Sequence, residues 1–180
     1  MQKSAKKIIH VKGLPGMPLV CALTEFEQNA QDIADFMENL LPDFPIVVVA
    51  ADADWVTHNT FKFVQFIRDQ QTDLTAMKLI MIGRERAANS LITVLKNEPS
   101  LFSDLILLNP LDWSPAPADI DLSDKRILIT WNTPLAGEKK QRLQAYADSF
   151  RALSARVFWN MSEIADDPEF EAQAMRTFIA

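Results

Sequence analysis

The sequence has few glycines and a single cysteine. Four glycines occur among 180 residues, whereas glycine makes up about 7% of an average protein. Because glycine lets the backbone turn at positive φ or approach a ligand closely, we expect few loops that cradle a ligand through main-chain atoms. The one cysteine, Cys21, excludes an intrachain disulfide and cannot form a zinc site by itself. We predict a buried structural thiol at Cys21, and we expect no metal and no cofactor.

Positive charge is also scarce, and no apolar run is long. The chain carries 18 Lys and Arg against 24 Asp and Glu, a net charge of −6. Nucleic-acid binding needs clustered basic residues that release counterions, so this composition argues against a nucleic-acid partner. No run approaches the roughly 20 apolar residues of a membrane-spanning helix. The apolar run from Ile8 is interrupted at Lys12 and Gly13, which argues against a secretory signal. We expect a cytoplasmic protein without membrane insertion.

Seven short apolar runs, rich in Val, Ile and Leu, alternate with amphipathic stretches of helical period. This alternation is typical of an α/β fold with a mostly parallel sheet buried on both faces. The predicted strands are residues 7–11, 18–23, 45–50, 78–83, 104–109, 126–131 and 155–159. We predict one domain over residues 1–180, doubly wound, with about six or seven strands, helices on both faces and no cap domain. The first strand is predicted to be an antiparallel edge.

The helices are predicted from their apolar spacing and their end signals. One begins near a capping box formed by Thr24 and Glu27 and ends before Pro42. Three more are predicted at residues 59–70, 85–96 and 138–153, and the last opens with Pro168.

The segment from Lys78 to Pro110 is the most informative. A strand leads into Gly83-Arg-Glu85-Arg-Ala87, a helix follows, and the next strand comes after a proline and a phenylalanine. This arrangement resembles the α/β-hydrolase superfamily, and within it the small carboxylesterase and phospholipase branch. In the nucleophile elbow of that fold, a strained turn requires small residues two positions before and two after the nucleophile. Gly83 and Ala87 meet this requirement, but Glu85 occupies the place of the nucleophilic serine.

The resemblance extends over roughly residues 7–180, and the other catalytic positions are also changed. Residues 24–27, Thr-Glu-Phe-Glu, stand where a His-Gly oxyanion loop would follow its strand. Thr133 stands at the position of the triad acid, and Glu163 at that of the triad histidine. The resemblance therefore implies a triad lost at all three positions. A different register that placed Ser90 or Ser162 on a turn would change this alignment.

Other groups offer weaker candidates for catalysis. Hydrolysis of an ester intermediate formed on a carboxylate needs a positioned base, normally histidine. Of the two histidines, His58 is the more credible base because it follows a strand at the ligand-binding edge, whereas His10 is interpreted as structural or solvated. Asp112 is a candidate for a relocated triad acid. Glu85 itself is also explained as a surface carboxylate favoured by the dipole at a helix start.

The four tryptophans follow a pattern. Trp55, Trp113, Trp131 and Trp159 each fall at or shortly after the end of a predicted strand. Ligands of open parallel sheets bind at this edge, so the indoles are candidates for binding a ligand or partner. The interpretation that we favour is that they fill the former active-site cavity.

Three functional hypotheses follow. The first is a catalytically inactive relative that binds a protein partner or a small apolar ligand. The second is an unusual esterase-type hydrolase that uses Glu85 with His58. The third is a structural subunit of a homo-oligomer. Candidate contact residues for the first are Trp55, His58, Glu85, Trp113, Trp131 and Trp159.

Overall fold

The structure is a computed structural model that describes residues 7–74, 76, 78–116, 119–164 and 167–180. Within this part of the chain, seven strands form one sheet in the order β1-β3-β2-β4-β5-β6-β7. The strands are β1 (Lys7–Val11), β2 (Leu19–Thr24), β3 (Ile46–Ala50), β4 (Leu79–Arg84), β5 (Asp104–Leu108), β6 (Arg126–Trp131) and β7 (Arg156–Met161). Only the β1–β3 pairing is antiparallel; the other pairings are parallel. The predicted mostly parallel sheet and its antiparallel edge are confirmed.

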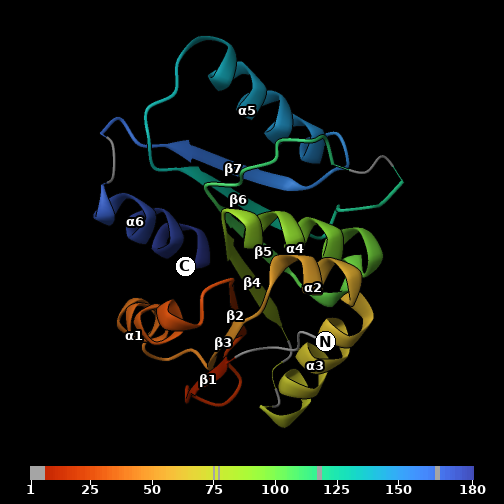
Figure 1. The fold of residues 1–180 in the computed structure, drawn as a ribbon, viewed down its shortest axis with the longest axis vertical. Helices are drawn as coiled ribbons and strands as arrows, with labels where there is room; N and C mark the ends of the chain where they lie inside the picture. The colour runs from red at the N-terminus through yellow and green to blue at the C-terminus, as the bar shows by residue number, and fades with distance from the viewer. Residues whose placement is uncertain (1–6, 75, 77, 117–118, 165–166) are drawn as a thin grey trace.

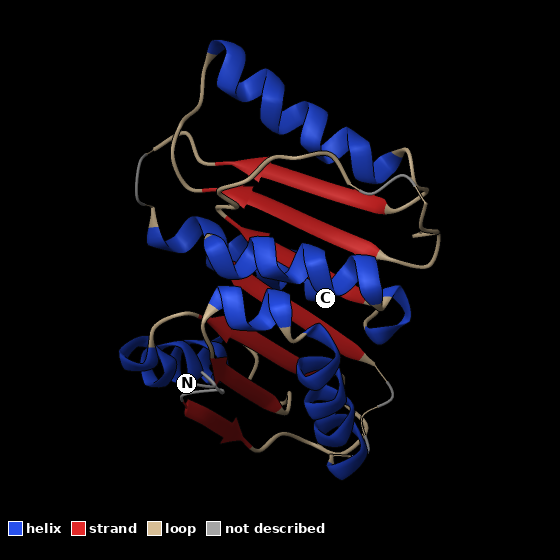
Figure 2. Cartoon of the chain, turned by 45° about the vertical axis from the view of Figure 1, so that its right-hand side comes forward, coloured by secondary structure: helices blue, strands red, loops and turns tan. Residues whose placement is uncertain are grey.

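In the described part of the chain, six α-helices cover both faces of the sheet (Figures 1 and 2). They are α1 (Ala30–Leu40), α2 (Ala53–His58), α3 (Thr60–Asp73), α4 (Arg86–Asn97), α5 (Gly137–Arg151) and α6 (Pro168–Ile179). Helices α1 and α6 pack on one face, and α2 to α5 pack on the other, because the buried residues divide into two clusters on opposite sides of the sheet. Neighbouring strand residues alternate between these clusters: Cys21 belongs to the larger and Ala22 to the smaller. Burial on both faces explains the continuous apolar strand runs.

The strand order has a reversal that positions the site. From β2 the chain moves to β3 on one side, and from β3 it crosses back to β4 on the other side of β2. In open α/β sheets, ligands bind outside the carboxyl ends of the strands at such a reversal. Here the carboxyl ends of β2 and β4 are Thr24 and Arg84.

One helix prediction was wrong in its local detail, and one short helix was not predicted. Thr24 does not cap a helix, because it is still paired with Ala50 in the sheet and its hydroxyl accepts a hydrogen bond from Phe26 N. A short 3₁₀ turn, Glu27–Asn29, intervenes before α1 begins at Ala30. The helix predicted to begin at residue 59 is preceded by a separate helix, α2, which Asp52 caps by accepting hydrogen bonds from the backbone N–H groups of residues 54 and 55.

Among the described residues, no helix is both long enough and apolar enough to cross a membrane.

Candidate functional site

The turn between β4 and α4 has the strained form expected of a nucleophile elbow. Glu85 adopts φ 54° and ψ −119°, a combination that non-glycine residues rarely adopt. Its backbone N–H donates to the carbonyl oxygen of Leu108 at 2.8 Å, which ties the turn to β5. A Cβ on Gly83 would lie 2.8 Å from the backbone nitrogen of Ala88, so only glycine fits there without movement. The lack of a side chain at Gly83 thus allows the backbone of Ala87 and Ala88 to pack against the end of β4.

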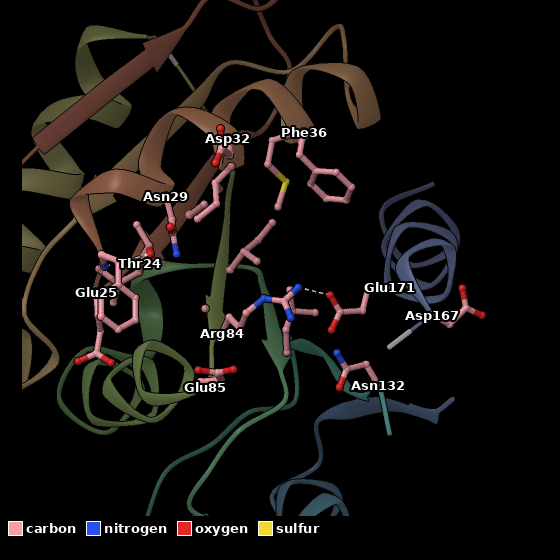
Figure 3. Close-up of a pocket in the computed structure, with 18 residues that line it drawn as sticks. Thr24, Glu25, Asn29, Asp32, Phe36, Arg84, Glu85, Asn132, Asp167 and Glu171 are labelled. Atoms are coloured by element: carbon pink, nitrogen blue, oxygen red, sulfur yellow. Dashed lines mark hydrogen bonds and ion pairs between the residues drawn. The ribbon is translucent and has the colours of Figure 1, made fainter. Parts of the chain in front are cut away.

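Glu85 lies at a cavity of about 550 Å³, within the range of small-molecule pockets. The cavity is formed by the ends of β2, β4 and β5, by helices α1 and α6, and by the connections that flank them (Figure 3). Its apolar lining consists of Ala22, Leu23, Phe26, Ile33, Phe36, Met37, Ile82 and Leu108. Its polar lining consists of Thr24, Glu25, Asn29, Asp32, Arg84, Glu85, Asn132, Asp167 and Glu171. The remaining lining residue is Gly83.

A polar network connects one side of the cavity to α6. Arg84 forms an ion pair with Glu171, whose side chain is only 9% exposed (Figure 3). Asn109 donates to the other carboxylate oxygen of Glu171 at 3.0 Å and accepts from the backbone N–H of Asn132 at 2.8 Å. Asn109 adopts φ 49°, which asparagine tolerates better than most residues. These contacts join the ends of β4, β5 and β6 to the helix that follows β7.

A second ion-pair network involves Arg86, immediately after the elbow. Its guanidinium lies 3.5 Å from Glu25 and 3.2 Å from Asp54. Glu25, in the connection after β2, lines the cavity. The contact therefore holds the connection after β2 against the start of α4.

Several solved structures have the same fold over nearly the whole chain. A protein of unknown function from Agrobacterium tumefaciens is 23% identical with a TM-score of 0.75, and the match covers 95% of this chain and 94% of that one. A carboxylesterase from Bacillus cereus is 13% identical with a TM-score of 0.76, with 96% and 92% covered. A phospholipase/carboxylesterase from Dyadobacter fermentans is 15% identical with a TM-score of 0.71, with 99% and 98% covered.

The chain has the α/β-hydrolase fold. At identities this low, the likeness establishes the fold and not an activity. No protein-family model and no curated protein matches the sequence.

In this α/β-hydrolase fold, the two remaining positions aligned with the triad lie outside the cavity lining. Thr133 and Glu163 are both exposed and do not line the cavity. Their neighbourhoods do reach it, through Asn132 after β6 and through Asp167 at the start of α6. Of the positions aligned with the triad, the structure therefore brings only Glu85 to the cavity.

Neither histidine of the chain lines the cavity. His58 ends α2, where its Nδ1 lies 2.6 Å from the carbonyl oxygen of Asp54. His10 lies on β1, the edge strand, and its Nε2 is 2.7 Å from Gln70 Oε1. Asp112 accepts hydrogen bonds from the backbone and hydroxyl of Ser114. Glu85 lines the cavity and His58 does not, so the structure does not bring the two side chains together there.

The other candidate nucleophiles are structural. Ser90 is buried within α4 and donates to the carbonyl oxygens of Ala53 and Arg86, each at 3.2 Å. Ser162 is buried just after β7, where its hydroxyl donates to the carbonyl oxygen of Ile164. Cys21 is fully buried, and desolvation raises the pKa of its thiol to about 12, as expected for an inert thiol. Among the described residues, no cluster of three or more His, Cys, Asp and Glu side chains is arranged to hold a metal.

The four tryptophans belong to the opposite face of the sheet. Trp55, Trp113, Trp131 and Trp159 all pack, partly buried, against the core cluster beneath α2 to α5. Trp113 and Trp131 form an edge-to-face pair with ring centroids 5.1 Å apart, and Trp113 donates to the carbonyl oxygen of Pro110. None of the four lines the cavity beside Glu85. The indoles therefore do not fill this cavity, which remains open.

Sequence reasoning missed Arg84, Asn132 and Glu171 as cavity residues, and it missed Asn109, which is hydrogen-bonded to Glu171 and Asn132. Glu171 carried one signal: it stands next to Ala172 on the inner face of α6, where a charged side chain needs a partner. That partner, Arg84, is 87 residues away in sequence. The spacing of residues gives no means of pairing groups so far apart.

Proposed function

We propose that this protein is a non-catalytic relative of the α/β-hydrolase-fold esterases that binds a small molecule with an apolar body in the cavity beside Glu85. The carrying observation is the combination at the elbow. The strained turn and an open cavity of about 550 Å³ are both present, yet Glu85 replaces the serine and neither histidine faces the cavity. The site is built to admit a ligand without the groups that turn over an ester.

The apolar lining supports a ligand with an apolar body. Ile33 and Met37, one turn apart on α1, form part of one wall, and Ile82 and Leu108 come from the sheet. Phe26 and Phe36 also line the cavity and are 52% and 42% exposed. Apolar lining with a few polar groups is the usual composition of a small-molecule site. A ligand that covers these rings would remove apolar surface from water.

Ester hydrolysis through Glu85 would need a second group to activate water. Two of the cavity carboxylates, Glu25 and Glu171, are each engaged in an ion pair with an arginine. Asp167 caps α6, which leaves Asp32 as the cavity carboxylate with neither an arginine partner among the described residues nor a capping role. The alternative hypothesis relied instead on His58, which does not line the cavity.

The test measures both turnover and binding on the full chain. Short-chain p-nitrophenyl esters should show no hydrolysis above the uncatalysed rate. Octanol or 2-phenylethanol should bind with a stoichiometry of one in calorimetry, and Phe36→Ala should weaken this binding. Phe61→Ala is the matched control, because Phe61 is 75% exposed on α3 and does not line the cavity. Ester turnover that disappears in Glu85→Ala would refute the proposal.

A further inference from the structure

The cavity carries an excess of negative charge. Its lining contains five carboxylates, Glu25, Asp32, Glu85, Asp167 and Glu171, and one cation, Arg84. Even when Arg86, which pairs with Glu25, is counted with the cations, the local charge is −3, since five negative charges meet two positive ones. A ligand that enters this cavity meets a negative potential.

Arg84 offsets this negative potential only in part. Its guanidinium pairs with Glu171, which also accepts a hydrogen bond from Asn109. If Arg84 turned away toward a ligand, the buried carboxylate of Glu171 would keep only its bond to Asn109. Leaving a buried carboxylate without its ionic partner is costly, so the structure holds Arg84 where it is.

Three of the carboxylates have no cationic partner among the described residues: Asp32, Glu85 and Asp167. Asp167 has a structural role, because its side chain caps α6 by accepting from Glu169 N at 3.0 Å. Asp32 lies in the first turn of α1, and Glu85 is held by the elbow at the start of α4. Figure 3 shows Asp32, Glu85 and Asp167 coming from three sides, with Arg84 between them.

We infer that the ligand of this cavity is a small amphiphilic cation, with an ammonium head that Glu85 recognises, an apolar body that lies against Ile33, Phe36 and Met37, and a further attraction from the negative charge to which Asp32 contributes. This inference rests on the proposed function and adds the charge of the ligand to it. The apolar cavity makes the site, and the unpaired carboxylates select the head. An anionic head on the same body would be repelled, and a neutral head would lose the charge–charge attraction.

The experiment compares three heads on each of two tails. Octylammonium, octanol and octanoate form one series, and 2-phenylethylammonium, 2-phenylethanol and 3-phenylpropanoate form the other. Calorimetry on the full chain should give an ammonium Kd about tenfold below that of the alcohol with the same tail, and weaker binding still for the carboxylate. Because the selecting charges are partly exposed, ionic strength raised from about 0.02 M to about 0.5 M should reduce the preference for ammonium.

Substitutions in the cavity test the recognition of the charged head and of the apolar body separately. Glu85→Gln keeps the side-chain volume and should weaken ammonium binding about fivefold more than it changes alcohol binding, so the preference for ammonium should fall. Glu138→Gln makes the same change in net charge on α5, away from the cavity lining, and should have no effect. Phe36→Ala should weaken all three heads alike.

Two outcomes overturn the inference. If alcohol or carboxylate binds as tightly as ammonium, and Phe36→Ala still weakens it, the charge assignment fails and the proposed ligand-binding function stands. The inference also fails if neither octylammonium nor 2-phenylethylammonium binds. Ester turnover, in contrast, overturns the proposed function itself, so the two failures are distinguishable.

Discussion

Replacing Glu85 by glycine should stabilise the protein relative to replacing it by alanine. Both substitutions remove the carboxylate, so the comparison isolates the backbone. At φ 54° and ψ −119°, a residue with a Cβ is strained, and such conformations cost about 1–3 kcal/mol. Glycine adopts positive φ without this cost, but it gains about 0.4–1 kcal/mol of entropy in the unfolded chain. The free energy of unfolding of Glu85→Gly should therefore exceed that of Glu85→Ala by about 1 kcal/mol.

An exposed helical position provides the matched control. Ala145 lies within α5, and its side chain is exposed. Ala145→Gly should lower the free energy of unfolding by about 1 kcal/mol, because glycine is the poorer helix former. The difference between alanine and glycine should thus have opposite signs at positions 85 and 145.

Urea unfolding followed by tryptophan fluorescence measures these differences, since four indoles pack against the larger core cluster. The m-values of the variants should agree, so that shifts in midpoint report stability alone. Suppose instead that Glu85→Gly is less stable than Glu85→Ala, by about as much as Ala145→Gly is less stable than the wild type. The elbow is then not strained, and our reasoning about it is wrong.

Three further predictions concern burial. Gly83→Ala should destabilise by about 1–3 kcal/mol, because its Cβ would lie 2.8 Å from Ala88 N; urea midpoints equal to wild type would contradict this. Burial raises the pKa of Cys21 from 9.0 to about 12, so above pH 9 only the unfolded state loses the thiol proton. The free energy of unfolding should therefore fall by up to about 1.4 kcal/mol per pH unit. Urea unfolding from pH 8 to pH 11 should show a smaller fall for Cys21→Ala, and an unchanged slope would refute this prediction. Tyr146→Phe should cost less than about 0.5 kcal/mol, since the buried Tyr146 hydroxyl has no hydrogen-bond partner among the described residues; a loss of about 2 kcal/mol in thermal unfolding would reveal a hidden one.

The strands could be predicted because each is a continuous apolar run. Neighbouring residues such as Val48 and Val49 point to opposite faces of the sheet, and each is buried in one of the two core clusters. A central strand therefore shows no alternation of apolar and polar residues in its sequence. The elbow was predictable for a similar local reason: Gly83, Glu85 and Ala87 are close in sequence, and the steric requirement acts within one turn. Helix α2 was missed because six residues are too few to show a helical period.

The cavity could not be predicted in the same way. Its walls come from α1 and α6, which are separated by most of the chain, and the ion pair between Arg84 and Glu171 exists only after the sheet is assembled. The tryptophans show the same limit. Trp131 and Trp159 stand near strand ends as predicted, but which face of the sheet a strand residue occupies depends on its register, and both face the core beneath α5. Proximity to a strand end gave the edge of the sheet at which the cavity lies, but the wrong side of the sheet.

Strain and charge at position 85 act through different atoms, and their separation tests whether the elbow still serves a purpose. Glu85→Gln keeps the Cβ and therefore the strain, so its free energy of unfolding should stay close to that of the wild type. If it also loses ammonium binding, the backbone conformation that costs stability is the one that presents the carboxylate to the ligand, a trade-off typical of functional sites. If Glu85→Gln binds ammonium as the wild type does while Glu85→Gly is more stable, the strain has no role in binding. The elbow would then be scaffold alone, and the cavity would select its ligand through Asp32.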